Sequence, residues 1–450
     1  MTGRKVINTT ERVYYFYYQF ILFIISLLYR KKGATMKVTF DKQKLLAAII
    51  PAAGISQTKN TLTSVDGLLF ECPPNPKFGD YDTDNPELCR ISAFDLEKGL
   101  RTSVECKIYE KGMFVINTVK ILQIVRALPD GEVTLEIDDK GRVSISCGFS
   151  NFEITATPGE DFPTMPMFIG ERQYKIPQYK IKDVISATIF SVAQNDQRAA
   201  FNGALWKIED GCLTSVGCDG NRLSAAKCDI SETNAEVPDA KIIIPGKFLG
   251  ELSKLLRDTE DEVLMIIGRR NVIFKIDDIY FFTRIIDTEY INYEKLLPTS
   301  YMTQAFVSAS ELRGAVERAS IVSEDKLGGS GRVHVKLEFV GDKITMSSVS
   351  RGGSLMEKIP ASIEGADITI GFDCRFLLDM VRACPSECDR LRIRLNSPLM
   401  GVLIEPSEGS GFVKATPDAD VFGERALDVA DEKVVRDSFM YFVMPIRMNK

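Results

Sequence analysis

The side chains able to perform acid–base or metal chemistry are few in this chain, and they are not grouped. His334 is the only histidine, and the ten cysteines include no CxxC pair. Proton transfer in enzymes most often uses histidine, and structural zinc requires closely spaced pairs of cysteine and histidine. We therefore expect neither a metal nor a cofactor. The simplest interpretation of the cysteines is that they are reduced cytosolic thiols.

Two acidic segments leave an enzyme open as an alternative. In CDGNR, residues 218–222, an acid could work beside Arg222 as an anion-binding group, and Asp95 with Glu97 could form a carboxylate pair. However, the chain has no GxSxG, P-loop, HExxH or dinucleotide-binding pattern. The residue chemistry therefore favours a binding protein without a catalytic site.

The other candidates for chemistry are basic residues that open amphipathic segments. Lys120, Lys247 and Arg375 stand at matching places, about 130 residues apart. The chain of 450 residues has a net charge of −6, which argues against bulk attraction to nucleic acid. A positively charged surface would have to be confined to a single inner face.

The segments that carry these basic residues are predicted helices, each followed by a strand. Apolar residues recur at helical spacing after each basic residue, and Thr118 and Asp373 are candidate N-caps. In each of the three repeats, a second type of helix precedes the helix that begins with the basic residue. Two helix types that recur in step indicate an internal repeat. The strands are predicted at Glu132–Ile137, Glu262–Ile267 and Arg390–Leu395, and the second helices at 45–56, 181–192 and 312–323.

The repeat predicts an α+β fold with three similar domains, each built from two helices and several short antiparallel strands. Length alone also suggests three domains. We place the domains at residues 36–166, 167–298 and 302–450. An insertion rich in Pro, Asn and Asp, residues 73–87, lengthens the first repeat, and a loop rich in Gly, Ser and acidic residues, 407–435, lies in the third.

The N-terminal segment does not fit the repeat. Residues 13–29 are an apolar run followed by Arg30, Lys31 and Lys32, which could be a short membrane anchor of a β-rich binding protein. We favour another interpretation, because Met36 opens a strand and helix that match the start of the third repeat, and the Lys31–Ala34 codons could hold a ribosome-binding sequence. Residues 1–35 are then a translated leader or an apolar extension, not part of the folded protein.

Several strings of residues resemble the β subunit of bacterial DNA polymerase III, the sliding clamp family. No single string identifies this family, but all five strings in this order, in a chain with three repeats, are specific to it. The resemblance extends from Met36 to Met448. The strings are FSVAQNDQRAAFNG (190–203), GCDGNRLSAAK (217–227), NYEKLLP (292–298), NSPLMGVLIEP (396–406) and YFVMPIRM (441–448).

This resemblance implies a function in DNA replication. Three domains per protomer and a head-to-tail homodimer would form a closed ring around double-stranded DNA, with the helices facing the hole. Such a protein is a cytoplasmic processivity factor without its own catalytic site or cofactor. The implied partners are the DNA polymerase III catalytic subunit, the clamp loader, repair polymerases and mismatch-repair proteins, with no membrane. A clamp paralogue that serves repair or drug resistance is an alternative that the sequence leaves open.

A ring that slides must hold phosphates loosely and cannot read base edges. The resemblance implies DNA contacts by Lys59, Asn195 and Lys247, and the repeated helices add Lys120 and Arg375, with Arg198 in the loop near Asn195. Gly246 stands where the family often has an arginine. The basic residues of the predicted helices are Lys42, Lys44, Lys120, Lys182, Lys247, Lys254, Arg313, Arg318, Arg375 and Arg382.

The resemblance also implies a groove for short peptides with leucine and phenylalanine anchors. Three positions depart from the family pattern: Cys218 replaces a usual Thr, Asn221 a frequent His and Ile446 a frequent Met. These departures could change which peptides are preferred. The matching residues are Phe201, Cys218, Gly220, Arg222, Leu223, Lys295, Leu296, Leu399, Gly401, Phe442, Met444, Pro445 and Ile446. For the dimer interface, the matching residues are Ile321 and Val322 of one chain and Phe152 of the other.

Overall fold

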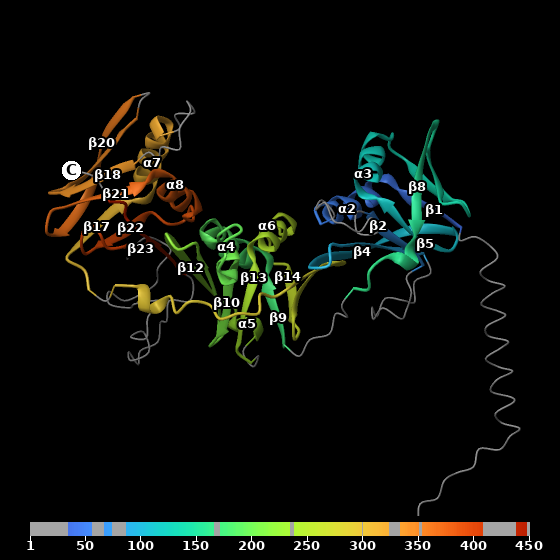
Figure 1. The fold of residues 1–450 in the computed structure, drawn as a ribbon, viewed down its shortest axis with the longest axis horizontal. Coiled ribbons are helices and arrows are strands. Elements are labelled where there is room, and N and C mark those ends of the chain that lie inside the picture. Colours follow the sequence, from blue (N-terminus) through green and yellow to red (C-terminus); the bar gives the residue numbers. More distant parts are fainter. Residues whose placement is uncertain are drawn as a thin grey trace, which may run out of the picture. The chain divides into compact units, whose positions relative to one another are not determined.

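The computed structural model describes residues 35–55, 67–73, 87–165, 172–234, 238–298, 300–323, 334–350, 353–407 and 438–447. The chain divides into two compact units, which are described one at a time (Figure 1). The first consists of Met1–Phe168 with Asp278–Tyr280, and the second of Ile169–Asp277 with Phe281–Lys450. The apolar run at 13–29 and most of the 73–87 and 407–435 segments lie outside the described residues.

The first unit is an antiparallel sheet that closes on itself, with two helices packed against it. Its strands are β1 (Met36–Asp41), β2 (Gly67–Cys72), β3 (Leu88–Phe94), β4 (Lys98–Glu110), β5 (Gly112–Asn117), β6 (Glu132–Ile137), β7 (Arg142–Cys147) and β8 (Ser150–Pro158). The order is β1-β6-β7-β8-β5-β2-β3-β4, and β4 pairs again with β1. The helices, α2 (Lys42–Ala53) and α3 (Thr118–Ala127), lie side by side.

Side-chain caps fix where three of the helices begin. The Asp41 carboxylate accepts hydrogen bonds from the backbone N–H groups of Gln43 and Lys44 and starts α2. Helix α3 is capped by Asn117, whose side chain accepts from Lys120 N at 3.0 Å. The prediction that Thr118 is this cap is wrong, because Thr118 is the first helical residue and is buried. The predicted cap Asp373 of helix α8 (Cys374–Ala383) is confirmed.

The N-terminal part of the second unit repeats the pattern of the first. Its strands are β9 (Arg172–Pro177), β10 (Gly203–Glu209), β11 (Cys212–Cys218), β12 (Arg222–Asp229), β13 (Ala240–Pro245), β14 (Glu262–Ile267), β15 (Asn271–Ile276) and β16 (Ile279–Arg284). Its helices are α4 (Gln178–Thr188), α5 (Ser231–Asn234) and α6 (Gly246–Leu255), with 3-10 turns η4 (Ile189–Ser191), η5 (Ala199–Asn202) and η6 (Glu294–Leu296).

The C-terminal part of the second unit repeats the pattern again. Its strands are β17 (Thr303–Ser308), β18 (His334–Val340), β19 (Lys343–Val349), β20 (Ser354–Gly365), β21 (Ile368–Asp373), β22 (Arg390–Leu395), β23 (Val402–Pro406) and β24 (Ser438–Val443). Its helices are α7 (Ala309–Ser323) and α8, which pack against each other.

One strand pair joins the two parts of the second unit into a continuous sheet. Strand β24, the last in the chain, pairs with β12, and the register places Leu223 opposite Phe442. The strand order is β13-β10-β11-β12-β24-β23-β22-β17-β20-β19-β18-β21. The helices of both parts also form a row, in which α6 contacts α4, α4 contacts α8 and α8 contacts α7. The two later repeats therefore form a single compact unit.

The predicted α+β fold with two main helices in each repeat is confirmed. The strands predicted at Glu132–Ile137, Glu262–Ile267 and Arg390–Leu395 have those bounds in β6, β14 and β22. The repeated helices could be predicted from the sequence because each buries one apolar stripe. In α6, for example, Phe248, Leu249 and Leu252 are buried. None of the helices in the described part of the chain is long and apolar enough to cross a membrane.

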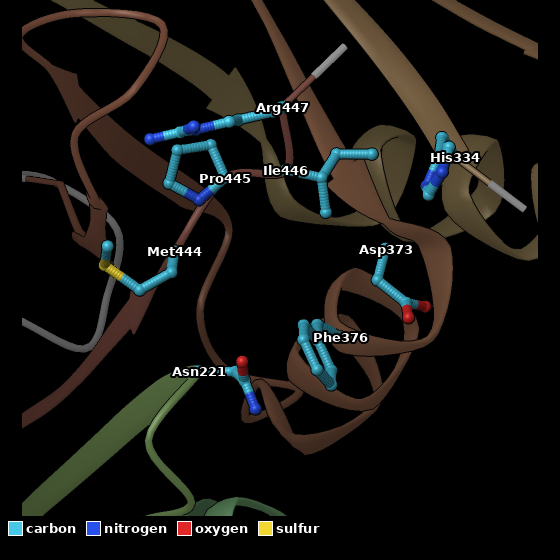
Figure 2. A pocket seen from close by; sticks show the side chains of 8 residues that line it. All are labelled: Asn221, His334, Asp373, Phe376, Met444, Pro445, Ile446 and Arg447. Carbon is cyan, nitrogen blue, oxygen red and sulfur yellow. The ribbon is translucent and has the colours of Figure 1, made fainter. Parts of the chain in front are cut away.

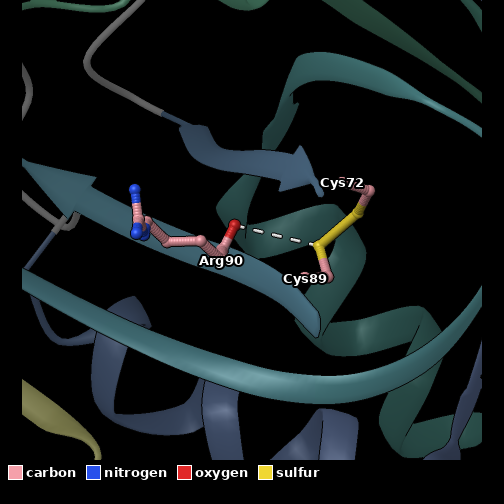
Figure 3. Close-up of a disulfide and its surroundings, with 3 residues drawn as sticks. All are labelled: Cys72, Cys89 and Arg90. Carbon is pink, nitrogen blue, oxygen red and sulfur yellow. Dashed lines mark hydrogen bonds between the residues drawn. A yellow bond between two sulfur atoms is a disulfide. The ribbon is translucent and has the colours of Figure 1, made fainter. Parts of the chain in front are cut away.

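The expectation that all cysteines are reduced is wrong for two of them. Cys72 and Cys89 form a disulfide between β2 and β3, with their Cα atoms 4.6 Å apart (Figure 3). The register that pairs Glu71 with Arg90 places the two cysteines directly opposite each other. The Cys89 sulfur also lies 3.8 Å from the Arg90 carbonyl oxygen. Sequence spacing cannot reveal such a pair, because strand register brings the residues together.

We expect eight free thiols in the unfolded, unreduced chain and ten after reduction, measured by thiol titration in guanidinium. Cys72→Ala should lower the free energy of unfolding by about 3 kcal/mol, because the disulfide restricts the unfolded chain. A reductant should lower the melting temperature of the wild type but not that of Cys72→Ala. Cys106→Ala, which changes a buried free thiol of the same unit, is the matched control and should keep the response to reductant. Ten thiols before reduction would contradict the disulfide.

Candidate functional site

A cleft of about 840 Å³ lies in the second unit, where the last strand joins the two parts of the sheet. It is formed by η5, the turn from β11 to β12, the segment around η6, the loop between β22 and β23, and the end of β24. All of the predicted peptide-groove residues except Pro445 and Ile446 line it. These are Phe201, Cys218, Gly220, Arg222, Leu223, Lys295, Leu296, Leu399, Gly401, Phe442 and Met444.

The floor of the cleft is a buried apolar cluster shared by both parts of the sheet. Phe201, Cys218, Leu223 and Phe442 belong to this cluster and are each less than a tenth exposed. Burial raises the pKa of the Cys218 thiol, so this residue acts as a small neutral floor residue. Gly401 packs directly on the Phe442 ring and leaves no space for a side chain. The floor is therefore rigid and apolar.

The rim of the cleft exposes flexible apolar side chains. Leu296, Leu399, Met400 and Met444 are between 40% and 63% exposed. Such exposed apolar groups around an apolar floor are typical of a surface that binds a partner. Methionine adapts its shape to different ligands. The arrangement suits a short apolar segment of another protein better than a charged small molecule.

Arg198 lies in the cleft lining, although it was predicted to contact DNA. Its guanidinium carbon is 4.0 Å from the centre of the Phe201 ring. It also donates two hydrogen bonds to the Asp196 carboxylate, which lower the pKa of Asp196 to about 2. Gly220 has a φ of 90°, and a Cβ there would lie 3.0 Å from Arg198 Nη2. Glycine therefore lets the turn and the arginine lie close together.

Pro445 and Ile446 line a second, neighbouring pocket of about 540 Å³ (Figure 2). Asn221 and Met444 line both pockets, so the two are adjacent. The backbone N–H of Met444 donates to the Asn221 carbonyl oxygen at 2.9 Å. The other residues of this pocket are His334, Asp373, Phe376 and Arg447. A bound segment could therefore continue from the cleft into this pocket.

The residues predicted to contact DNA have different surroundings. Lys120 and Lys247 are exposed near the starts of α3 and α6, and neither has an ion pair among the described residues. Asn195 is exposed in a loop and has a φ of 61°. Arg375 is exposed near the start of α8 but donates to Asp373 at 2.8 Å. Lys59 lies outside the described residues.

Some basic residues of the repeated helices have structural roles. Lys42 is buried and donates to the Leu128 carbonyl oxygen at 2.6 Å. This hydrogen bond supplies a donor to a carbonyl group at the C-terminal end of α3, which has no partner within the helix. Arg313 of α7 donates to the carbonyl oxygens of Val381 and Cys384 at the end of α8. These two side chains hold helices in place and cannot turn freely toward a phosphate. The number of basic residues that could contact DNA is smaller than the sequence pattern suggested.

The residues predicted for the dimer interface are exposed in the single chain. Phe152 lies on β8 in the first unit and is 39% exposed. Ile321 lies near the end of α7 in the second unit and is 76% exposed, and Val322 beside it is partly buried. A large apolar side chain that is mostly exposed is a candidate for burial in an interface.

Sequence reasoning missed some of the cleft lining. Asn221 was named only as a departure from the family pattern, and the residues not named for the groove are Ile291, Asn292, Leu297, Pro298, Ser300, Asn396 and Met400. Most lie within the strings that carried the resemblance or next to them, so the signal was present. His334 gave no signal, because a lone histidine at the start of a strand has no partner until register pairs it with Asp373.

The chain matches three domains described for one family. Residues 36–166 match the N-terminal domain of the DNA polymerase III beta subunit, residues 175–292 its central domain and residues 294–417 its C-terminal domain. Together these matches cover most of the chain.

Individual relatives agree with this match over nearly their whole length. The chain is 28% identical to a beta sliding clamp of Vibrio cholerae, over 92% of this chain and 100% of that protein. It is 27% identical to the beta sliding clamp of Bacillus subtilis, over 84% of this chain and 98% of that protein. The fold matches a crystal structure of the Bacillus subtilis DNA polymerase sliding clamp with a TM-score of 0.77 at 22% identity, over 92% of this chain and 100% of that chain. The chain belongs to the DNA polymerase III beta subunit family.

Proposed function

We propose that this chain is a DNA sliding clamp that works as a homodimeric ring around duplex DNA and tethers the replicative polymerase. The observation that carries the proposal is the repeated helix pair. In the second unit the pairs form one row, α6-α4-α8-α7, and the first unit supplies α2 and α3. Lys120, Lys247 and Arg375 are exposed near the starts of equivalent helices. A ring that presents such helices inward would have its positive charge where DNA passes.

The contacts with DNA would be weak and interchangeable, as sliding requires. Lys120 and Lys247 have long side chains without an ion pair in the described part of the chain, and they can follow successive phosphates, whereas Arg375 must exchange its bond with Asp373. Asn195 lies in an exposed loop after η4 and would add a polar contact. Lys59, which lies outside the described residues, is expected from the sequence to add another. Electrostatic contacts of this kind weaken steeply with salt. The clamp would stay on DNA because the ring is closed, not because the contacts are strong.

The cleft and the neighbouring pocket would bind short peptide motifs. The apolar floor and flexible rim suit leucine and phenylalanine anchors. We expect affinities near micromolar, or about −8 kcal/mol, which allow partners to exchange. The partners would be the polymerase III catalytic subunit, the clamp loader, repair polymerases and mismatch-repair proteins. The clamp would act in the cytoplasm without a cofactor, a membrane or a catalytic step of its own.

Topological binding can be tested by loading the clamp with a clamp loader and ATP onto nicked circular DNA. We expect the clamp to stay on the circle at high salt, because a closed ring cannot leave, and to be lost within minutes after the DNA is cut once. Gel filtration of DNA-bound protein before and after cutting measures this. A clamp that dissociates equally from circular and linear DNA would contradict the ring.

The cleft can be tested with Gly401→Ala and a fluorescent pentapeptide that has two leucines and a C-terminal phenylalanine. The new methyl group would displace the Phe442 ring from the floor, and we expect binding to weaken about tenfold. Fluorescence anisotropy measures the dissociation constant. Gly353→Ala is the matched control, since a Cβ there meets nothing within 4 Å. Equal affinities of both variants and the wild type would place the peptide elsewhere.

The dimer interface can be tested with the double variant Ile321→Ala and Val322→Ala. We expect monomers in sedimentation velocity, because the variant removes two apolar side chains from the centre of the proposed contact. Met302→Ala, which truncates another exposed apolar side chain of the second unit, should leave the dimer intact. A stable dimer of the double variant would show that the interface lies elsewhere.

A further inference from the structure

The Arg222 side chain forms hydrogen bonds with several segments of the second unit. Its side chain is only 11% exposed, although it lines the cleft. Three of its nitrogen atoms donate to acceptors on three different segments. Nε donates to Asp219 Oδ2 at 3.0 Å, Nη1 to Asp379 Oδ2 at 2.6 Å and Nη2 to the Phe190 carbonyl oxygen at 2.6 Å.

Aromatic rings complete the surroundings of this guanidinium. Its carbon lies 5.2 Å from the centre of the Phe190 ring and 4.7 Å from that of the Phe376 ring. Phe190 in turn contacts Tyr441 of β24 at 5.5 Å between ring centres. The Tyr441 hydroxyl donates to the Ala383 carbonyl oxygen at the end of α8. Arg222 of β12 is therefore the centre of a cluster that also includes Tyr441 of the paired strand β24.

These contacts connect the two halves of the binding surface. Asp219, in the turn from β11 to β12, and Phe190, in η4, belong to the N-terminal part of the second unit, whereas Asp379 and Phe376 belong to α8 in its C-terminal part. Phe376 lines the second pocket. Asp379, by contrast, lines neither the cleft nor the second pocket. The bond from Arg222 to Asp379 thus ties the cleft to the helix that forms a wall of the second pocket.

We propose that Arg222 is a positioning residue that fastens helix α8 to the turn between β11 and β12, so that the cleft and the second pocket keep one relative geometry. Its effect on peptide binding passes through Asp379 and not through a hydrogen bond to the peptide. This proposal rests on the proposed peptide-binding function. The physical reason is that each nitrogen of this mostly buried guanidinium already donates one hydrogen bond to the protein, so that reorienting the side chain toward a ligand would break these bonds.

The decisive variant is Asp379→Asn, because it leaves Arg222 and every lining residue in place. The probe is the fluorescent pentapeptide with two leucines and a C-terminal phenylalanine, and the full-length dimer is used. We expect about tenfold weaker binding, the loss typical of a hydrogen bond between charged groups. Asp379→Glu, which keeps a carboxylate, should restore most of the affinity. Glu311→Gln, an equal charge change at an exposed carboxylate on the adjacent α7, is the control and should bind as the wild type.

Two further measurements separate positioning from direct contact. Arg222→Ala and Arg222→Ala with Asp379→Asn should bind the probe equally weakly, because both remove the same bond. Amide hydrogen exchange of α8, Cys374–Ala383, should accelerate in Asp379→Asn without the peptide present. Asp379→Asn with unchanged affinity would overturn the proposal, whether or not Arg222→Ala weakens binding. A wild-type chain that does not bind the probe would instead overturn the proposed peptide-binding function.

Discussion

The structure of the second unit depends on the pairing of its last strand with β12. This pairing lies between residues that are more than two hundred positions apart in the sequence, and it makes one sheet out of two repeats. Leu223 and Phe442, opposite each other in this pair, form the floor of the cleft. The hydrogen bonds of the ladder fix their register, so the cleft has a defined shape without any ligand. The cleft is thus a consequence of how the two repeats are joined.

Charge compensation sets a limit on how strongly such a protein can hold DNA. Lys42 and Arg313 bond to helix ends, and Arg375 bonds to its own cap, Asp373. Exposed residues such as Lys120 and Lys247 supply positive charge but no rigid geometry. A few mobile cations give weak contacts that are easily exchanged, as a sliding protein needs. The net charge of −6 also keeps the affinity for DNA low, because it opposes the binding of DNA to the outside of the protein.

The cleft combines a rigid floor with a compliant rim. Gly401 leaves room for the Phe442 ring, and Tyr290 supports Phe201 by an edge contact with 6.5 Å between ring centres. The rim residues Leu399 and Met444 are exposed and can adjust. Rigid surroundings define where an anchor side chain enters, while flexible thioether and leucyl groups accept different neighbours. This division of roles fits a surface that exchanges several partners.

The amino-acid sequence predicts the repeat, the helix pairs and the strands that follow them, because these depend on local periodicity and on caps such as Asp373. It also indicated most of the cleft residues, since these lie in short strings that resemble one family. The folded chain was needed to show that Cys72 meets Cys89, that Lys42 is buried, that Arg198 stacks on Phe201 in the cleft and that Arg222 reaches Asp379. The bonds of Cys72 and Arg222 join separate segments of the chain, and strand register and packing, not local pattern, bring them together.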